Sequence, residues 1–159
     1  MRSKVLALDL GTTTGWAMLC TGREIPKVVS GSQSFKPQRF DGGGMRYLRF
    51  SRWLAELCDV GKPVPERVVY EEVRRHAGVD AAHAYGGFLS HLQSFCEERE
   101  IPYEGVPVGS IKKHVTGRGN ANKEQMVEAV RRLGYLPVDD NEADAIALLL
   151  FDIHCTGAA

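Results

Sequence analysis

The fold of this chain is decided near its start, where the sequence reads Val5-Leu6-Ala7-Leu8-Asp9-Leu10-Gly11-Thr12-Thr13-Thr14-Gly15-Trp16-Ala17. An apolar run ends in one acid, a Gly/Thr turn follows, and a second apolar run leads away. This pattern predicts a β-hairpin with Asp9 on its first strand, packed in the core of an α/β domain. Because burying an unpaired charge is expensive, Asp9 needs a compensating group, such as a metal ion or a phosphate–metal complex.

Length and composition limit the class of protein. The 159 residues suffice for one compact domain spanning residues 1–159. Lys and Arg total 20, as do Asp and Glu, and this balance does not favour nucleic-acid binding unless acids and bases are segregated. The four cysteines form no CxxC pair, as expected of thiols in a reducing compartment. We find no signal peptide and no membrane-spanning run, and expect a cytoplasmic protein.

Strands and helices alternate along the rest of the chain. We expect strands at residues 4–9, 15–21, 28–35, 67–70 and 103–108. We expect helices at 45–60, 79–100, 121–133 and 141–153. We interpret 36–44 as a loop, 61–66 as a connector, and 108–111 as the cap of a basic, glycine-containing stretch. Arg46, Arg49 and Arg52 recur at helical spacing and form a basic edge, which we interpret as solvated. The small residues of 79–100 fit either packing on the sheet or a dimer face.

Three acids stand where apolar elements end or begin. Asp9 and Glu71 end apolar strands, and sites in open α/β sheets form beyond the carboxyl ends of strands. Asp144 shares a helical face with Asp140 and Asn141. Helix capping explains the acids before Asp144 well, but Asp144 itself is followed by an apolar run. An acid that enters a buried helix requires a partner charge.

Convergence of these acids would define a metal site. Like charges at Asp9, Glu71 and Asp144 would raise one another's pKa, and divalent cations would remove that conflict. Hard oxygen ligands suit Mg²⁺ or Mn²⁺, and no Cys/His spacing competes with them. Two such ions, about 4 Å apart, can clamp a phosphodiester for in-line attack by water. The pattern is therefore typical of a two-metal phosphodiester hydrolase.

Here the sequence resembles the RuvC family of Holliday junction resolvases, in the RNase H-like superfamily. Besides Asp9 and Glu71 at strand ends, the resemblance is carried by the last helix, Asn141-Glu142-Ala143-Asp144-Ala145-Ile146-Ala147. It is also carried by the stretch Ile111-Lys112-Lys113-His114-Val115-Thr116-Gly117-Arg118-Gly119-Asn120-Ala121-Asn122-Lys123. The Asp-x-x-Thr-Thr-Thr-Gly-Trp-Ala form of the first motif resembles phage-type relatives, acting in a bacterial or phage-infected cell.

The resemblance implies an RNase H-like fold, with a mixed central sheet of about five strands flanked by helices. It also implies a homodimer that nicks Holliday junctions or other branched DNA with two Mg²⁺ ions per site, for which Mn²⁺ would substitute. Asp9, Glu71 and Asp144 match three of the family's four metal positions. At the fourth, Asn141 replaces the usual Asp or His, so either Asn141 or Asp140 would complete the site.

The resemblance also assigns basic residues to the DNA. Lys112 and Lys123 match the family's two basic residues near the scissile phosphate. The bases expected to hold phosphates are Arg74, Arg75, Lys112, Lys113, Arg118 and Lys123. Arg74 stands where cellular members of the family place an aromatic residue, so sequence preference and strand opening are expected to differ.

Two other classes fit parts of the sequence. The turn after Asp9 also looks like the phosphate-binding turn of sugar kinases, actin and chaperone ATPases, which need two RNase H-like domains and a cleft between them. A non-catalytic module that binds branched DNA or protein would explain an asparagine at 141. That module would bind DNA without nicking it.

Overall fold

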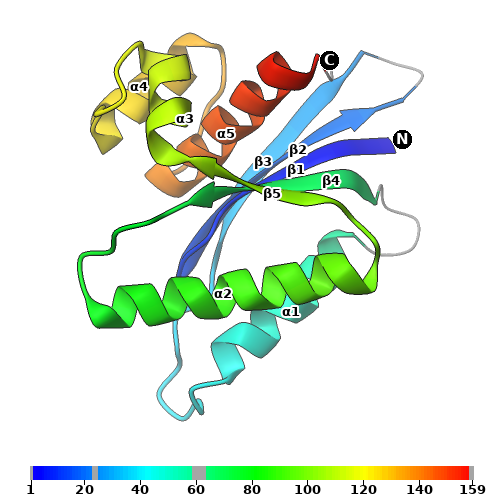
Figure 1. The fold of residues 1–159 in the computed structure, drawn as a ribbon, viewed down its shortest axis with the longest axis vertical. Coiled ribbons are helices and arrows are strands. Elements are labelled where there is room, and N and C mark those ends of the chain that lie inside the picture. The colour runs from blue at the N-terminus through cyan, green and yellow to red at the C-terminus, as the bar shows by residue number, and fades with distance from the viewer. Residues whose placement is uncertain (1, 23–24, 59–63, 158–159) are drawn as a thin grey trace.

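The structure is a computed structural model that describes residues 2–22, 25–58 and 64–157. A five-stranded mixed sheet lies between two groups of helices (Figure 1). The strands are β1 (Arg2–Asp9), β2 (Thr13–Thr21), β3 (Lys27–Ser34), β4 (Pro65–Glu72) and β5 (Tyr103–Pro107). The helices are α1 (Met45–Leu57), α2 (Val79–Glu98), α3 (Val108–Thr116), α4 (Lys123–Arg132) and α5 (Asp140–Thr156).

The sheet has the strand order β3-β2-β1-β4-β5. β1, β2 and β3 form an antiparallel meander, whereas β4 and β5 run parallel to β1. This arrangement confirms the predicted α/β class, with a mixed sheet of five strands and the N-terminal hairpin at its centre. The carboxyl ends of β1 and β4 therefore meet at one edge of the sheet.

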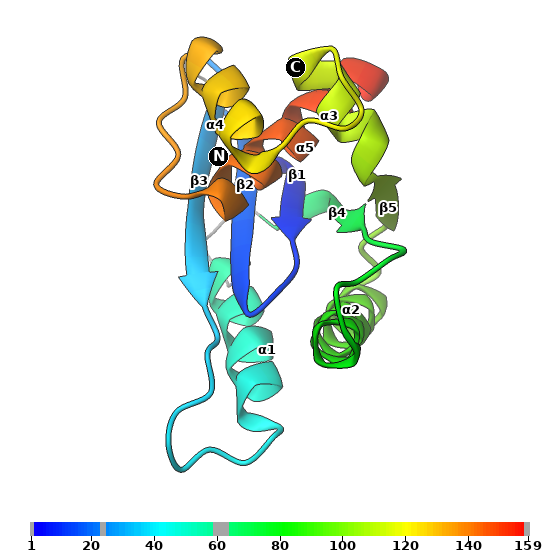
Figure 2. The ribbon, with the colours of Figure 1, turned by 90° about the vertical axis from the view of Figure 1, so that its left-hand side faces the viewer.

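Alternation along β1 sorts its side chains between two cores. Val5 and Ala7 pack on the side of α3, α4 and α5, whereas Leu6 and Leu8 pack on the side of α1 and α2. Figures 1 and 2 show these two helical layers on opposite faces of the sheet. Asp9 continues the odd-numbered series, so its side chain belongs to the face covered by α5.

Most element boundaries agree with the sequence, and one helix differs. The basic stretch after residue 108 forms α3, which the sequence analysis did not predict as a helix. The helix was hard to recognise because it is short and only Ile111 is fully buried. It ends at Gly117, whose φ of 78° is a left-handed conformation that glycine adopts without strain.

Helix ends also shift by a few residues. α1 ends at Leu57 rather than near residue 60, and part of the connector predicted at 61–66 lies outside the described residues. α4 begins at Lys123 because Asn122 and Gln125 form a capping box. No helix within the described ranges is both long and apolar enough to cross a membrane. The four cysteines all lie in the described part of the chain, and none forms a disulfide.

Candidate metal centre

The parallel pairing of β1 with β4 sets two acids side by side. Leu8 pairs with Tyr70, so Asp9 and Glu71 are the next residues on neighbouring strands. Both continue the series of side chains that faces α5, in which Val69 is fully buried. The register of two buried strands thus places both carboxylates on the same face of the sheet.

The first turn of α5 is anchored to β3 by side-chain hydrogen bonds. Asp139 caps the helix, since its carboxylate accepts from the Glu142 backbone N–H at 2.8 Å. Ser32 Oγ donates to Asp139 at 2.7 Å, and Ser30 Oγ donates to the buried Glu142 carboxylate at 2.7 Å. These bonds fix the position from which Asp144 reaches the strand ends.

Gly15 lets α5 approach the sheet closely, and the sequence analysis did not single it out. Gly15 pairs with Asp9 across the hairpin. A Cβ built on Gly15 would lie 1.8 Å from the Asn141 carbonyl oxygen, so any side chain here would displace the start of α5. A glycine inside a strand is the signal that would have indicated this close approach.

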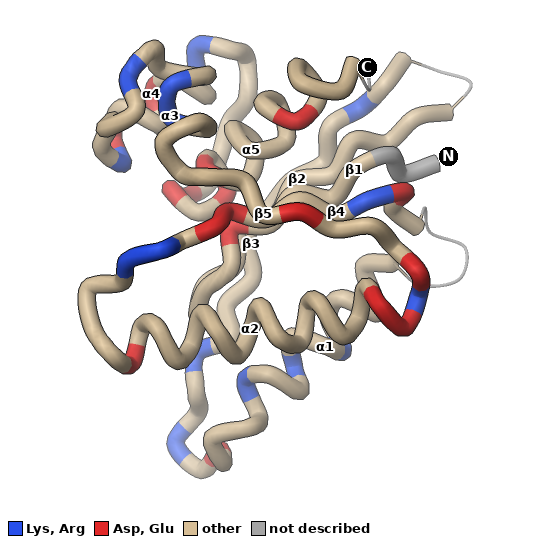
Figure 3. Tube along the Cα trace, viewed as in Figure 1, with Lys and Arg blue, Asp and Glu red and all other residues tan. Residues whose placement is uncertain are grey.

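These contacts bring Asp9, Glu71 and Asp144 together. One carboxylate oxygen from each lies within 4.8 Å of the other two, and all three residues are half-buried. Figure 3 shows acidic segments at the end of β4 and the start of α5 on the same side of the molecule. The three acids come from residues far apart in the sequence and form one cluster that solvent can still reach.

Burial raises the pKa of all three carboxyl groups, and repulsion between acids raises the pKa of Asp9 and Asp144 further. Burial raises the pKa of Asp9 well above its usual value, and the charges of Glu71 and Asp144 raise it further. Burial, followed by the charges of Glu71 and Asp140, raises the pKa of Asp144 to about 7. Burial raises the pKa of Glu71, although the charge of Lys112 acts in the opposite direction. A divalent cation would relieve this repulsion, and an all-oxygen donor set fits a hard cation.

Two lysines border the acidic cluster. Lys112, on α3, lines one small cavity together with Glu71 and Asp144, and its charge lowers the pKa of both. Lys123, at the start of α4, forms an ion pair of 3.0 Å between its Nζ and Asp140 Oδ2. The Asp140 carboxylate raises the pKa of Lys123, with smaller effects from the nearby acids. Both lysines thus lie within electrostatic reach of the acidic cluster.

Comparison with known proteins identifies the family. The crossover junction endodeoxyribonuclease RuvC of Halorhodospira halophila is 30% identical over 156 residues, covering 96% of this chain and 90% of that protein. The chain belongs to the RuvC family. The RuvC of Thermomicrobium roseum is 36% identical over 109 residues, covering 67% of this chain and 66% of the relative. A scan against protein-family models found no match.

Solved structures show the same fold. A T. thermophilus RuvC in complex with a Holliday junction substrate superposes with a TM-score of 0.75 at 23% identity, covering 92% of this chain and 90% of the other. A second Thermus thermophilus RuvC structure gives a TM-score of 0.72 at 24% identity, covering 98% and 97%. These likenesses confirm the predicted RNase H-like fold, and family membership confirms the predicted crossover junction endodeoxyribonuclease class. The phage-type assignment stays a prediction.

Asp140 and Asn141, the two residues predicted for a fourth metal position, make different contacts in this RuvC-family protein. The Asp140 carboxylate pairs with Lys123 and is not one of the three clustered acids. Asn141 is half-buried, and its backbone rests against Gly15 in the first turn of α5. Which of the two completes the site stays a prediction.

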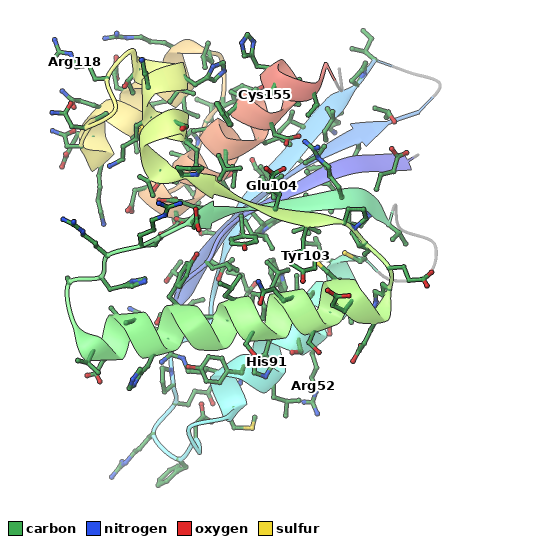
Figure 4. All side chains as sticks on the ribbon, in the orientation of Figure 1. Arg52, His91, Tyr103, Glu104, Arg118 and Cys155 are labelled. Atoms are coloured by element: carbon green, nitrogen blue, oxygen red, sulfur yellow. The ribbon has the colours of Figure 1, made fainter. Side chains whose placement is uncertain are left out.

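The remaining basic residues predicted to bind DNA lie on the surface of the RuvC fold. Arg74 and Arg75 are exposed in the loop directly after β4, where Arg74 pairs with Glu72 at 3.3 Å. Lys113, on α3, is exposed, and so is Arg118, which Figure 4 places at the outer edge of the α3–α4 region. Their role in phosphate binding stays a prediction, since the contacts in the structure do not test it.

Proposed function

We propose that this protein is a Mg²⁺-dependent endonuclease that nicks Holliday junctions and related branched DNA. The observation that carries the proposal is the convergence of Asp9, Glu71 and Asp144 within 4.8 Å. Relatives named crossover junction endodeoxyribonuclease support the substrate, as does a fold neighbour solved with a Holliday junction.

The acidic cluster would hold the metal. Asp9, Glu71 and Asp144 are the proposed ligands of two Mg²⁺ ions, with Asn141 or Asp140 completing the set, and Mn²⁺ would substitute because it accepts the same oxygen donors. When bound, the ions would lower the pKa of the attacking water and stabilise the leaving oxyanion. The carboxylates remain accessible because each is only half-buried.

The two lysines would act on the phosphate itself. Lys112 lies against Glu71 and Asp144, so its ammonium can donate to a phosphate oxygen held at the acidic cluster. Lys123 pairs with Asp140 in this structure, and its exposed ammonium can exchange that carboxylate for a phosphate oxygen. Both lysines would stabilise negative charge that develops on the phosphate during cleavage.

Basic side chains on the protein surface would hold the DNA, and two subunits would cut it. We assign phosphate contacts to Arg74, Arg75, Lys112, Lys113, Arg118 and Lys123. A four-way junction has two-fold symmetry, so a homodimer would place one acidic cluster on each of two opposing strands. Paired nicks require that dimer, and a monomer in light scattering with junction DNA would contradict it.

The test is nicking of junction, flap and duplex DNA of matched length, with and without Mg²⁺. We expect nicking of the junction only with Mg²⁺ or Mn²⁺, and a loss of about 100-fold or more in Asp144→Asn, because a metal ligand supports several kcal/mol of transition-state stabilisation. Asp80→Asn is the control, since Asp80 is an exposed acid on α2. Failure of the wild type to nick any of the three DNAs would refute the proposal.

A further inference from the structure

The loop between β3 and α1, residues 35–44, presents a phenylalanine to solvent. The Phe40 side chain is 91% exposed, more than any other large hydrophobic side chain in the described part of the chain. Figures 1 and 2 show the loop protruding beyond α1 at the end of the molecule. An aromatic ring that is exposed on a protruding loop does not stabilise the folded state through burial. Its exposure indicates a role in binding.

Hydrogen bonds hold this loop in one conformation. The Asp41 carboxylate accepts two bonds from the Arg49 guanidinium, at 2.6 and 2.8 Å, and a third from the Gln38 backbone N–H at 2.7 Å. The Asp41 side chain is only 10% exposed, although it belongs to a surface loop. A bidentate arginine–carboxylate pair fixes geometry in both partners. Phe40, next to Asp41, therefore lies in a turn whose conformation is fixed by hydrogen bonds.

Hydrogen bonds attach both ends of the loop to the turn beside the acidic cluster. The Phe35 backbone N–H donates to the Thr12 carbonyl oxygen at 2.7 Å, and the Arg46 guanidinium donates to Thr12 Oγ1. Thr12 lies in the hairpin turn three residues after Asp9. The loop therefore starts and ends against the turn that follows the first metal ligand, at the edge of the sheet where the acids converge.

The surroundings of Phe40 are basic. The Arg39 guanidinium lies over the Phe40 ring, 5.3 Å from its centroid. From residue 36 to residue 52 the sequence carries five basic residues and one acid, whereas the whole chain has no net charge. Figure 3 shows these basic segments gathered on the loop and α1. An exposed aromatic ring in a surface of mixed charge could contact many kinds of protein. A ring in a basic surface favours a polyanion as the partner.

We infer that Phe40 stacks on an unpaired base of the branched DNA, while Arg39 and Lys36 contact the adjacent phosphates. Aromatic side chains between basic residues bind single-stranded nucleic acid in this way, because every base presents a π-face. Paired bases within a duplex are already stacked, so the ring selects DNA whose bases are open, as near a branch point. This inference rests on the proposed function, and it assigns part of the substrate selectivity to the 35–44 loop.

The test compares three substitutions of Phe40 by binding, without divalent metal, to a labelled four-way junction and to a duplex of equal length. Phe40→Ala and Phe40→Leu should weaken junction binding by about 5- to 100-fold and leave duplex binding unchanged, whereas Phe40→Trp should bind the junction as wild type does. Leu136→Ala is the matched control, because Leu136 is 87% exposed and lies in the α4–α5 connector. Thermal midpoints confirm that each variant is folded.

A second substitution separates stacking from charge. Arg39→Gln should weaken binding to junction and duplex alike and reduce the salt dependence of binding by about one counterion for each bound subunit. Full junction affinity in Phe40→Ala would overturn the inference, because it would show that the ring does not contact the DNA. Full affinity in Phe40→Leu would overturn it as well, because it would show an apolar contact without stacking. If Phe40→Ala weakened duplex binding as much as junction binding, that result would also overturn the inference.

Adding Mg²⁺ to the same samples, and measuring nicking as well as binding, distinguishes the two proposals. If the wild type nicks the junction with Mg²⁺ and Phe40→Ala binds and nicks it equally well, only the stacking role fails. If the wild type neither binds nor nicks branched DNA, the proposed function fails and the stacking role fails with it.

Discussion

At the scale of single residues, the acidic cluster makes the metal-free protein sensitive to pH. The pKa values of Asp9, Glu71 and Asp144 are all raised, so the folded protein holds these protons more tightly than the unfolded chain. Their contribution to stability is complete below the unfolded pKa, near 4, and is lost as the pH rises through the folded pKa, about 7 for Asp144. Divalent cations oppose this loss because they neutralise the same charges.

The corresponding prediction concerns Mg²⁺ and thermal stability. Mg²⁺ should raise the melting temperature at pH 8 by about 3–6 °C and have little effect at pH 5, where the carboxyl groups keep their protons. Asp144→Asn should raise the melting temperature of the metal-free protein at pH 8 and reduce the effect of Mg²⁺. Asp80→Asn, an exposed acid on α2, should behave as wild type. Differential scanning calorimetry at both pH values is the measurement, and an equal Mg²⁺ effect at both would contradict the linkage.

At the scale of elements, the site depends on how closely α5 lies against the β1–β2 hairpin. Gly15 permits that contact, and a methyl group there would clash with the Asn141 carbonyl oxygen. Because the obstacle is backbone, the start of α5 must move, and Asp144 moves with it. The geometry of the acidic cluster is therefore set partly by a residue that carries no functional group.

Gly15→Ala should accordingly lower both stability and activity. We expect a loss of about 1–3 kcal/mol from overpacking, and a fall in Mg²⁺-dependent nicking at a temperature where the variant is still fully folded. Gly86→Ala, on α2, is the control, because no atom lies within 4 Å of its added Cβ. Chemical denaturation and nicking rates measure the two effects, and unchanged nicking in folded Gly15→Ala would show that α5 can shift without disturbing the cluster.

The sequence predicts the elements that have strong local patterns and misses contacts between distant ones. Apolar runs that end in Asp9 and Glu71 were recognisable as strands, and family membership supports their pairing. A glycine inside a strand signals that something approaches closely at Gly15, but it does not show that the partner is α5, more than a hundred residues away. Arg46 and Arg49 were expected to be solvated, but both bind side chains, those of Thr12 and Asp41. Helical spacing places such residues on a face without showing what lies opposite.

At the scale of the whole molecule, zero net charge conceals a segregated surface. Acids meet at the ends of β1 and β4 and the start of α5, whereas basic residues gather on the 35–44 loop, α1 and the α3–α4 region (Figure 3). DNA responds to the charges that it touches, because salt screens the rest within about 10 Å. A neutral protein can therefore bind DNA with the salt dependence of a basic one.

We predict that junction affinity falls by about 1,000-fold or more between 50 and 200 mM salt, as expected for six or more phosphate contacts. Lys113→Gln should reduce the slope of log affinity against log salt by about two, because it removes one contact in each subunit of the proposed dimer. Arg132→Gln should leave the slope unchanged, since Arg132 pairs with Glu128 on α4 and is not assigned to DNA. Fluorescence anisotropy at three or more salt concentrations gives the slopes. A flat response would mean that the segregated bases do not meet the phosphates, and the assigned DNA surface would be wrong even if the acidic cluster binds metal.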